Sequence, residues 1–544
     1  MKTIKYNDFL DKVHGGWYAK CLGGAAGAPV EGIKKIIDIN DFTEIYNPDL
    51  PNDDLDIQLL WLEVLETKGA HINSCDLADA WLEKCWYPFS EYGYFVKNYK
   101  RGIKPPYSGV INNSFFKEGM GCPIRSEIWG FISVGNPALA AQYAYMDATL
   151  DHADNSVYAE QFLAAVESMA FFENDMEKLF KIGLEYIPNS CKLAKCISMV
   201  TELYKNNNDW RIVRETVLRH FGHPDFSNVT QNLGFVAIAL LYGKNDIRRT
   251  INIALKCGYD ADCTCASAAS VVGIIQGYTA LGEDICELIN DYFVVGIDVQ
   301  RPSNSIKELA SDTCAAALRV PNDEVLFLDV PSEFEQIQKP TEFKGFELEQ
   351  VTEDGLRREK EKLKPICWEV YGPFFEPLEK ETDTNYPSPH GEGCTLPPLE
   401  CMVNNAVCLE KEYIDERGVE KLEPFCVIEA YEDLIPLEDS IQTEGQMCCY
   451  LKTDITVEAD MTAWIVIGNT DGFKVLNNGE VVIARDEIRY WTPYNNFELI
   501  NLKKGTNRIV LKLLRRTERL KFSIGFRMYD GSHWHRSHWH IDMP

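Results

Sequence analysis

The sequence predicts a two-part protein, an all-α domain followed by an all-β sandwich of jelly-roll type. Three observations predict it: helical spacing of apolar residues in the first part, a polar and charged stretch after it, and β-rich runs parted by turns from there on. The expected boundaries are residues 1–328 for the helical domain, 329–364 for a linker and 365–544 for the sandwich. A chain of 544 residues allows each part its own core, since domains usually take about 100–200 residues.

Helices are expected where apolar residues recur three and four positions apart. The segment Cys263–Gly282 carries no charge, but it is rich in Ser, Thr, Gly and Gln, which is typical of a helix packed closely inside a helical domain and not of a membrane span. Strand-like alternation is nearly absent before residue 320, so no βαβ sheet is expected there. Four runs show the helical spacing: Leu55–Leu65, Ala159–Phe172, Leu193–Tyr204 and Leu233–Tyr242.

The chain changes character between residues 329 and 364, where it becomes polar and ends in the charged run Glu353–Lys364, which predicts a solvated connecting helix. After Trp368, runs of β-branched and aromatic residues alternate with Gly, Asn and Asp turns. Asn477, Asn478 and Gly479 predict a tight hairpin. Strands of this kind in close succession are typical of a jelly-roll sandwich.

The charge balance excludes some classes of partner. The net charge of −29 repels polyanions, so no nucleic-acid partner is expected. The first residues, MKTIKYNDFLDKVHGG, show no apolar core of a signal peptide, which predicts a cytoplasmic protein with no membrane partner and with reduced cysteines. The acidic excess serves solubility or gathers carboxylates for cations, and composition leaves both open.

Two predicted helix beginnings carry paired acids. Asn52 caps one helix, with Asp53 and Asp54 in its first turn, and Asp260 and Asp262 precede the small-residue helix. Acids at a helix N-terminus also favour the helix dipole and need no further role. If the two pairs meet, charges about 5 Å apart repel by roughly 3 kcal/mol per pair, and bound Mg²⁺, Mn²⁺ or Ca²⁺ would remove that repulsion.

Four segments in order resemble the ADP-ribosylglycohydrolase family. GGWYAKCLGGAAGAPVEG is similar to its glycine-rich first helix ending in P-V-E, and PNDDLDIQ to its T-D-D-T element. DHADNSVYAEQFLAAVESMAFF is similar to its T-H element, and GYDADCTCASAASVVGIIQG to its G-G-D-T-D-T helix. The resemblance covers about residues 10–285. It implies an all-α fold that holds two metal ions, usually Mg²⁺, and hydrolyses an α-glycosidic bond to ADP-ribose.

The resemblance assigns roles to residues at matching positions. Glu31, at the end of the P-V-E element, is the implied catalytic carboxylate. The implied metal ligands are Asn52, Asp53, Asp54, Asp260 and Asp262. The implied substrate-binding residues are His152, Asp154, Asn155, Arg125, Glu127 and Tyr259.

Three positions depart from the family pattern. Asn52 stands where the family has Thr, and its amide oxygen can still bind a hard cation. Cys263 stands where the last Thr ligand is expected; a thiol is a poor ligand for Mg²⁺, and Thr264 is the neighbouring alternative. Gly24 replaces an aspartate, and the segment containing Glu127 and Trp129 differs from the family's nucleotide pocket.

These observations predict a metal-dependent glycosyl hydrolase that cleaves an ADP-ribosyl or related ribosyl-like bond, with a small glycoside or an ADP-ribosylated molecule as substrate. The alternatives are a glycoside hydrolase for a non-nucleotide carbohydrate and a decayed binding protein of the same fold. The oligomeric state stays open. The C-terminal histidines His533, His535, His538 and His540 are compatible with a transition-metal site, an aromatic lid or an exposed chain end.

Overall fold

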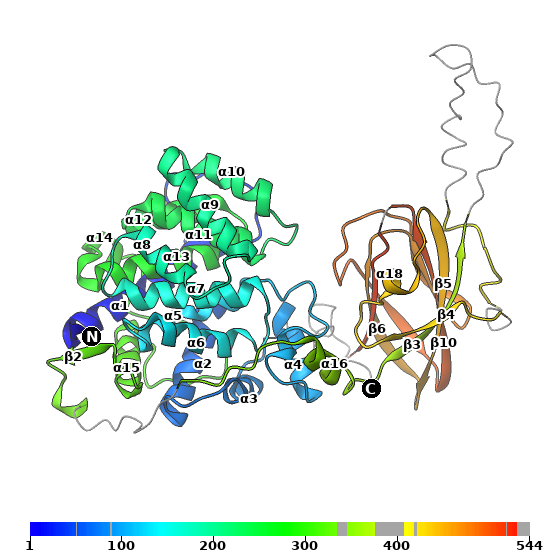
Figure 1. Ribbon diagram of the computed structural model, residues 1–544, viewed down its shortest axis with the longest axis horizontal. Coiled ribbons are helices and arrows are strands. Elements are labelled where there is room, and N and C mark those ends of the chain that lie inside the picture. Colours follow the sequence, from blue (N-terminus) through cyan, green and yellow to red (C-terminus); the bar gives the residue numbers. More distant parts are fainter. Residues whose placement is uncertain are drawn as a thin grey trace, which may run out of the picture. The chain divides into compact units, whose positions relative to one another are not determined.

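The computed structural model describes residues 1–49, 52–87, 90–334, 345–375, 407–417, 422–517 and 519–529. Contacts divide the chain into two units, Met1–Leu356 and Arg357–Pro544 (Figure 1). The first unit is helical and the second is built from antiparallel sheets, so the predicted fold class is confirmed. The C-terminal histidines lie outside the described residues.

The first unit contains the helices, most of them separated by short loops and 3₁₀ turns. They are α1 (Tyr6–Gly27), α2 (Asp53–Lys68), α3 (Ser74–Lys84), α4 (Ser90–Lys100), α5 (Ser126–Ile132), α6 (Pro137–Ala148), α7 (Asn155–Ala170), α8 (Met176–Leu184), α9 (Lys192–Asn206), α10 (Trp210–Phe221), α11 (Val229–Gly243), α12 (Ile247–Cys257), α13 (Ala261–Gln276), α14 (Glu283–Cys286) and α15 (Ile306–Arg319). The four runs with helical spacing fall on α2, α7, α9 and α11, as predicted. The charged run after them forms α16 (Glu353–Lys360).

Helix α1 packs along α13 in very close contact (Figure 1). A Cβ atom at Gly23 would collide with the carbonyl of Cys265, and one at Gly27 with the carbonyl of Ala261. Glycine is therefore required at these points, because the two backbones touch where any side chain would stand. Most of α13 is buried, as expected for the uncharged small-residue segment. No helix among the described residues is long and apolar enough to cross a bilayer.

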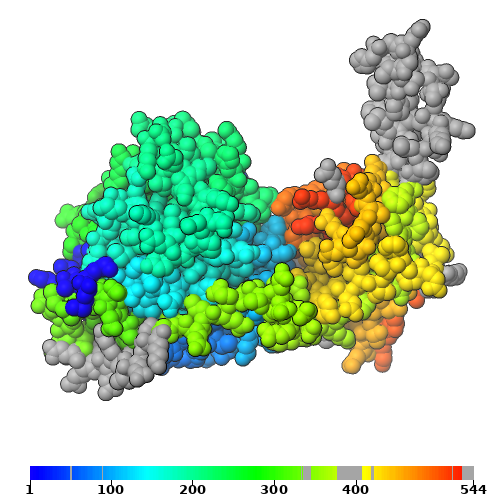
Figure 2. All heavy atoms as spheres, in the orientation of Figure 1, coloured from blue at the N-terminus to red at the C-terminus, as the bar shows by residue number. Residues whose placement is uncertain are grey.

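A short parallel pair of strands was not expected in the helical part. β1 (Lys2–Lys5) pairs with β2 (Val325–Leu328), which places the first residues beside those that follow α15 (Figure 2). Each strand has four residues, which is too short for a period-two pattern to stand out from the sequence. The partners are more than 300 positions apart, so only the tertiary structure brings them together.

The second unit is a two-sheet sandwich. Its strands are β3 (Ile366–Phe374), β4 (Cys426–Ala430), β5 (Met447–Val457), β6 (Met461–Asn469), β7 (Phe473–Asn477), β8 (Glu480–Arg485), β9 (Asn496–Leu502), β10 (Gly505–Arg515) and β11 (Phe522–Met528), with one helical turn, α18 (Leu437–Ser440). One sheet has the order β4-β3-β5-β10-β7-β8 and the other β11-β6-β9. Residues of both sheets, such as Leu451 and Ile465, share one core. The six-stranded sheet also buries a second cluster, which includes Tyr450 and Val510.

The predicted hairpin joins β7 to β8. Asn477 pairs with Glu480, and Asn478 and Gly479 between them have φ values of 51° and 83°. Positive φ at both central residues is the requirement of a type I′ turn, which explains the Asn-Gly pair.

The contact between α1 and α13 gives a first prediction. Gly27→Ala should destabilise the protein by about 1–3 kcal/mol, because the added methyl group must displace the α13 backbone. Chemical denaturation measures the change. Asn7→Ala, at an exposed position of the same helix, is the control and should shift the midpoint little. Equal stability of the two variants would show that the helices can separate without cost.

Candidate metal centre

The two acidic helix beginnings meet in the structure. Asn52 caps α2, and its Oδ1 accepts the backbone N–H of Asp54 at 2.8 Å. Asp260 is the N-cap residue of α13, and Asp262 lies in the first turn. The helices are far apart in sequence, but α1 packs against α13 and contacts α2, so both N-termini reach the same place.

The segment that carries Glu31 is held against the start of α13. Gly32 donates its N–H to the carbonyl of Tyr259 at 2.8 Å, and Tyr259 donates its N–H to the carbonyl of Ile33 at 2.9 Å. Tyr259 has φ of 64°, and Gly258 before it has φ of 69° and lies so close to the carbonyl of Lys35 that a Cβ would collide. These two backbone hydrogen bonds form a paired turn, which holds Glu31 beside Asp260 and Asp262.

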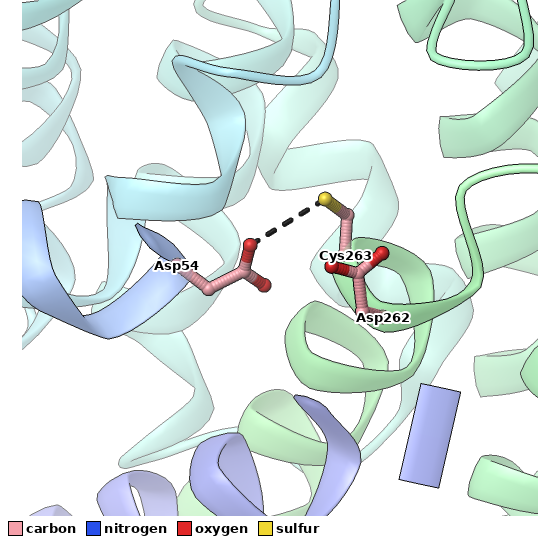
Figure 3. Close-up of side chains that lie close together, drawn as sticks. All are labelled: Asp54, Asp262 and Cys263. Atoms are coloured by element: carbon pink, nitrogen blue, oxygen red, sulfur yellow. Dashed lines mark hydrogen bonds between the residues drawn. The ribbon is translucent and has the colours of Figure 1, made fainter. Parts of the chain in front are cut away.

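Two overlapping groups of side chains result. We call Glu31, Asp260 and Asp262 the oxygen set, and Asp54, Asp262 and Cys263 the thiol set. Within each set, one ligand atom from each residue lies within 4.8 Å of the others. Figure 3 shows Asp54 facing Cys263, with Asp262 next to it on α13. Asp262 belongs to both sets, an arrangement that suits two neighbouring cations.

The remaining predicted ligands lie at the edge of these sets. Asp53 accepts a hydrogen bond from the hydroxyl of Tyr92 at 3.3 Å. Asn52 uses its Oδ1 as the cap of α2, and its amide nitrogen fills the space that a side chain at Gly24 would need. The two departures at positions 24 and 52 are therefore spatially linked.

Burial and mutual repulsion raise the pKa values of these acids. Burial raises the pKa of Asp54 to about 7, an effect that Lys20 opposes and Asp262 increases. Burial, followed by Glu31, raises the pKa of Asp262 to about 6. Loss of hydration, followed by Asp53 and Asp54, raises the pKa of Glu31 to about 7, although the residue is exposed at the rim. Burial and neighbouring acids also raise the pKa values of Asp53 and Asp260.

The residues present fit a divalent cation. Asp54 Oδ2 and Asp262 Oδ1 are buried and accept no hydrogen bond from any residue that the structure describes. Buried carboxylate oxygens without donors are costly unless a cation faces them. The oxygen set offers the hard ligands that Mg²⁺, Mn²⁺ and Ca²⁺ prefer.

Lys20 lies directly behind Asp54. Its ammonium is 3.5 Å from Asp54 Oδ2 and 2.9 Å from Glu127 Oε1, and it donates a hydrogen bond to the carbonyl of Ile124 at 2.7 Å. Glu127 also accepts a hydrogen bond from the amide of Gln58 at 2.9 Å. Glu127 is fully buried, and its carboxylate pairs with the ammonium of Lys20.

Arg125 and His152 form a second buried network. Arg125 donates two hydrogen bonds of 2.8 Å to the Asp151 carboxylate and pairs with Asp147 at 2.8 Å. His152 contacts Asp151 through Nδ1 at 2.6 Å and Glu91 through Nε2 at 3.4 Å. Burial lowers the pKa of His152, but Asp151 and Glu91 outweigh it and hold the value near 9.

His152 and Arg125 have no exposed surface, so a substrate could reach them only if their surroundings moved. Their polar partners are the buried carboxylates Asp147, Asp151 and Glu91. The other predicted substrate residues lie elsewhere. Asp154 is exposed and pairs with Lys117 at 2.7 Å, Asn155 receives the backbone N–H of Leu193 at 3.0 Å, and Tyr259 lies beside Glu31 in the paired turn.

Sequence reasoning missed the buried partners Lys20, Glu91, Asp147 and Asp151. A signal existed for Lys20, the only charged residue between Val13 and Val30. Such a lysine inside an apolar, glycine-rich helix needs an acidic partner. For the three acids no spacing rule pointed to burial.

A family model described as ADP-ribosylglycohydrolase matches residues 5–322. Among solved structures, an ADP-ribosylglycohydrolase-related protein complex is 18% identical, with 57% of this chain and 98% of that chain covered and a TM-score of 0.38. A PA14 sugar-binding domain from an RTX adhesin is 10% identical, with coverages of 34% and 99% and a TM-score of 0.18.

A third structure, a β-glucosidase from Kluyveromyces marxianus in complex with glucose, is 14% identical, with coverages of 21% and 14% and a TM-score of 0.18. No curated protein matches the chain. The family model spans more than half of the 544 residues and contains all the acids of the two sets. The chain belongs to the ADP-ribosylglycohydrolase family.

Proposed function

We propose that the helical unit is a divalent-metal-dependent glycosyl hydrolase that cleaves an ADP-ribosyl or related ribosyl-like glycosidic bond. The observation that carries the proposal is that Glu31, Asp54 and Asp260 all lie close to Asp262, which belongs to both sets. Membership of the family supports the reaction class. The proposed substrate is a small glycoside or an ADP-ribosylated molecule, and the net charge of −29 argues against nucleic acid.

A divalent ion bound to these acids would supply Lewis-acid stabilisation and orient water and the oxygens of a sugar or diphosphate. We assign its binding to Asp53, Asp54, Asp260 and Asp262, with Asn52 ordering the first turn of α2. Mg²⁺ is the proposed ion for the oxygen set, because all its donors are carboxylates.

Glu31 is the proposed acid–base residue. It is exposed while Asp54, Asp260 and Asp262 are buried, and its pKa near 7 lets it hold or accept a proton at neutral pH. In the proposed reaction, the bond from the anomeric carbon to the leaving group breaks while the carbon gains oxocarbenium character, and a water oxygen forms the new bond. Glu31 accepts the proton that the water releases and returns it to the leaving group, which departs with the electron pair of the broken bond. Lys20, Arg125 and His152 act as positioning residues.

The substrate assay tests this proposal directly. The full chain, incubated with ADP-ribosyl-arginine, ADP-ribosyl-serine and simple glycosides, should hydrolyse at least one of them and stop when a chelator is added. Glu31→Gln should lower kcat by about 10²–10⁴-fold, whereas Asp38→Asn, an exposed acid on the same segment, should not. Cleavage of glycosides alone would favour the carbohydrate alternative. Binding of one of these compounds without turnover would favour the decayed binding protein.

Metal binding should also be visible as stability. At 100 times its Kd, Mg²⁺ should stabilise the wild-type fold by about 2.7 kcal/mol, because only the folded chain assembles the site. Asp260→Asn combined with Asp262→Asn should abolish the Mg²⁺-dependent rise in Tm. The exposed Asp8→Asn is the control. An undiminished rise in the double variant would exclude these acids as ligands.

The raised pKa values predict how this effect depends on pH. The pKa values of Asp54, Asp262 and Glu31 are about 7, 6 and 7 in the fold, above their ordinary values of 3.8, 3.8 and 4.5. Between those limits the folded chain binds more protons than the unfolded chain, so without metal its stability falls as pH rises from about 4 to 7. Mg²⁺ competes with these protons. Its Tm shift should therefore be larger at pH 8 than at pH 6, and equal shifts would contradict the assignment.

A further inference from the structure

Cys263 makes the two sets chemically different. Its Sγ lies 3.4 Å from Asp54 Oδ1, to which the thiol donates a hydrogen bond (Figure 3). Thr264 instead turns its hydroxyl to the carbonyl of Ala261 in its own helix, at 3.3 Å. The residue that faces Asp54 at this point of α13 is therefore the cysteine, and the thiol set has one sulfur and two carboxylates.

The thiol set is buried, and two of its carboxylate oxygens accept no hydrogen bond from any described residue. Asp54 is 1% exposed, and Asp262 and Cys263 are each 8% exposed. Asp54 Oδ2 and Asp262 Oδ1 are buried and accept no hydrogen bond from any described residue, although Lys20 lies 3.5 Å from the first of them. Asp262 Oδ1 thus lies buried without a donor beside a buried sulfur, and a bound cation would offset the cost of burying it.

The geometry and the charges suit one divalent ion. Two atoms bound to one ion at about 2.1 Å for oxygen and about 2.3 Å for sulfur can lie 3.4 Å apart, as Asp54 Oδ1 and Cys263 Sγ do. Two carboxylates and a thiolate carry three negative charges; one divalent ion balances two of them, and Lys20, which Asp54 shares with Glu127, offsets part of the third. Sulfur ligands favour Zn²⁺ and similar ions over Mg²⁺.

We propose that the thiol set binds a thiophilic divalent transition ion such as Zn²⁺, while the oxygen set binds Mg²⁺ or a similar hard ion, so that Asp262 joins two different ions. The inference rests on the metal centre of the proposed function. The incoming ion replaces the thiol proton that Cys263 shares with Asp54, and this proton leaves to solvent; the cysteine is not oxidised.

Co²⁺ is the probe, because its bond to a thiolate gives a sulfur-to-metal charge-transfer absorption that carboxylates do not give. The full chain is stripped with chelator, supplied with Mg²⁺ and titrated with Co²⁺. We expect the absorption to saturate at one equivalent, to persist in excess Mg²⁺ and to disappear when Zn²⁺ replaces Co²⁺. Bound Co²⁺ without this absorption, or its displacement by Mg²⁺, would overturn the proposal.

The variants identify the sulfur. Cys263→Ser should lose the absorption and bind Zn²⁺ on the order of 100-fold more weakly. It should still bind Mg²⁺. Cys265→Ser is the matched control, since this fully buried cysteine of the same helix contacts the carbonyl of Ile251 and should keep the absorption. Retention of the signal in Cys263→Ser, or its loss in Cys265→Ser, would refute the assignment.

Zn²⁺ binding by two further variants and comparison with the hydrolase assay complete the test of the thiol set. If Cys263→Ser does not fold, Cys263→Ala and Asp54→Asn each remove one donor of the thiol set, and each should weaken Zn²⁺ binding at least tenfold; unchanged binding would refute the site. Failure of every substrate in the hydrolase assay would leave the Co²⁺ result standing, because absorption does not require turnover. Conversely, hydrolysis with Mg²⁺ alone and no sulfur signal would retain the hydrolase and reject the thiol site.

Discussion

The structure of the helical unit depends on the burial of several carboxylates where α1, α2 and α13 meet. Glycines of α1 let α13 approach until the backbones touch, and this contact brings Asp262 next to Glu31 and Asp54. Burial and mutual repulsion hold the pKa values of these acids well above their usual range. Positive charge next to these carboxylates would favour their ionised form, and a bound cation would supply that charge.

Two buried networks supply part of that charge from the protein itself. Lys20 pairs with Asp54 and Glu127, and Arg125 pairs with Asp147 and Asp151. Breaking such buried pairs usually costs about 3–5 kcal/mol, because an uncompensated charge remains. Lys20 and Arg125 thereby order the buried carboxylates that they contact. They also account for the burial of His152 and Glu127, to which the family resemblance assigned contact with substrate.

The donor atoms divide the centre into two unequal halves around Asp262. The oxygen set opens toward solvent through Glu31, which suits an acid–base residue and a hydrated hard ion. The thiol set is closed and contains sulfur, which suits an ion that gives up its water readily. A hydrolase with this centre would separate the binding of a structural or polarising ion from the chemistry at the exposed carboxylate.

The sequence by itself determined the helical and β-rich parts, the cap of α2 and the hairpin at Asn478 and Gly479, because these depend on periodicity and on local backbone preferences. Only the tertiary structure decided that Asp54 and Asp262 share a site, that Cys263 and not Thr264 faces them, and that Lys20 lies behind them. Spacing along a helix shows which residues share a face, but which face meets a segment two hundred positions away depends on how closely the helices pack.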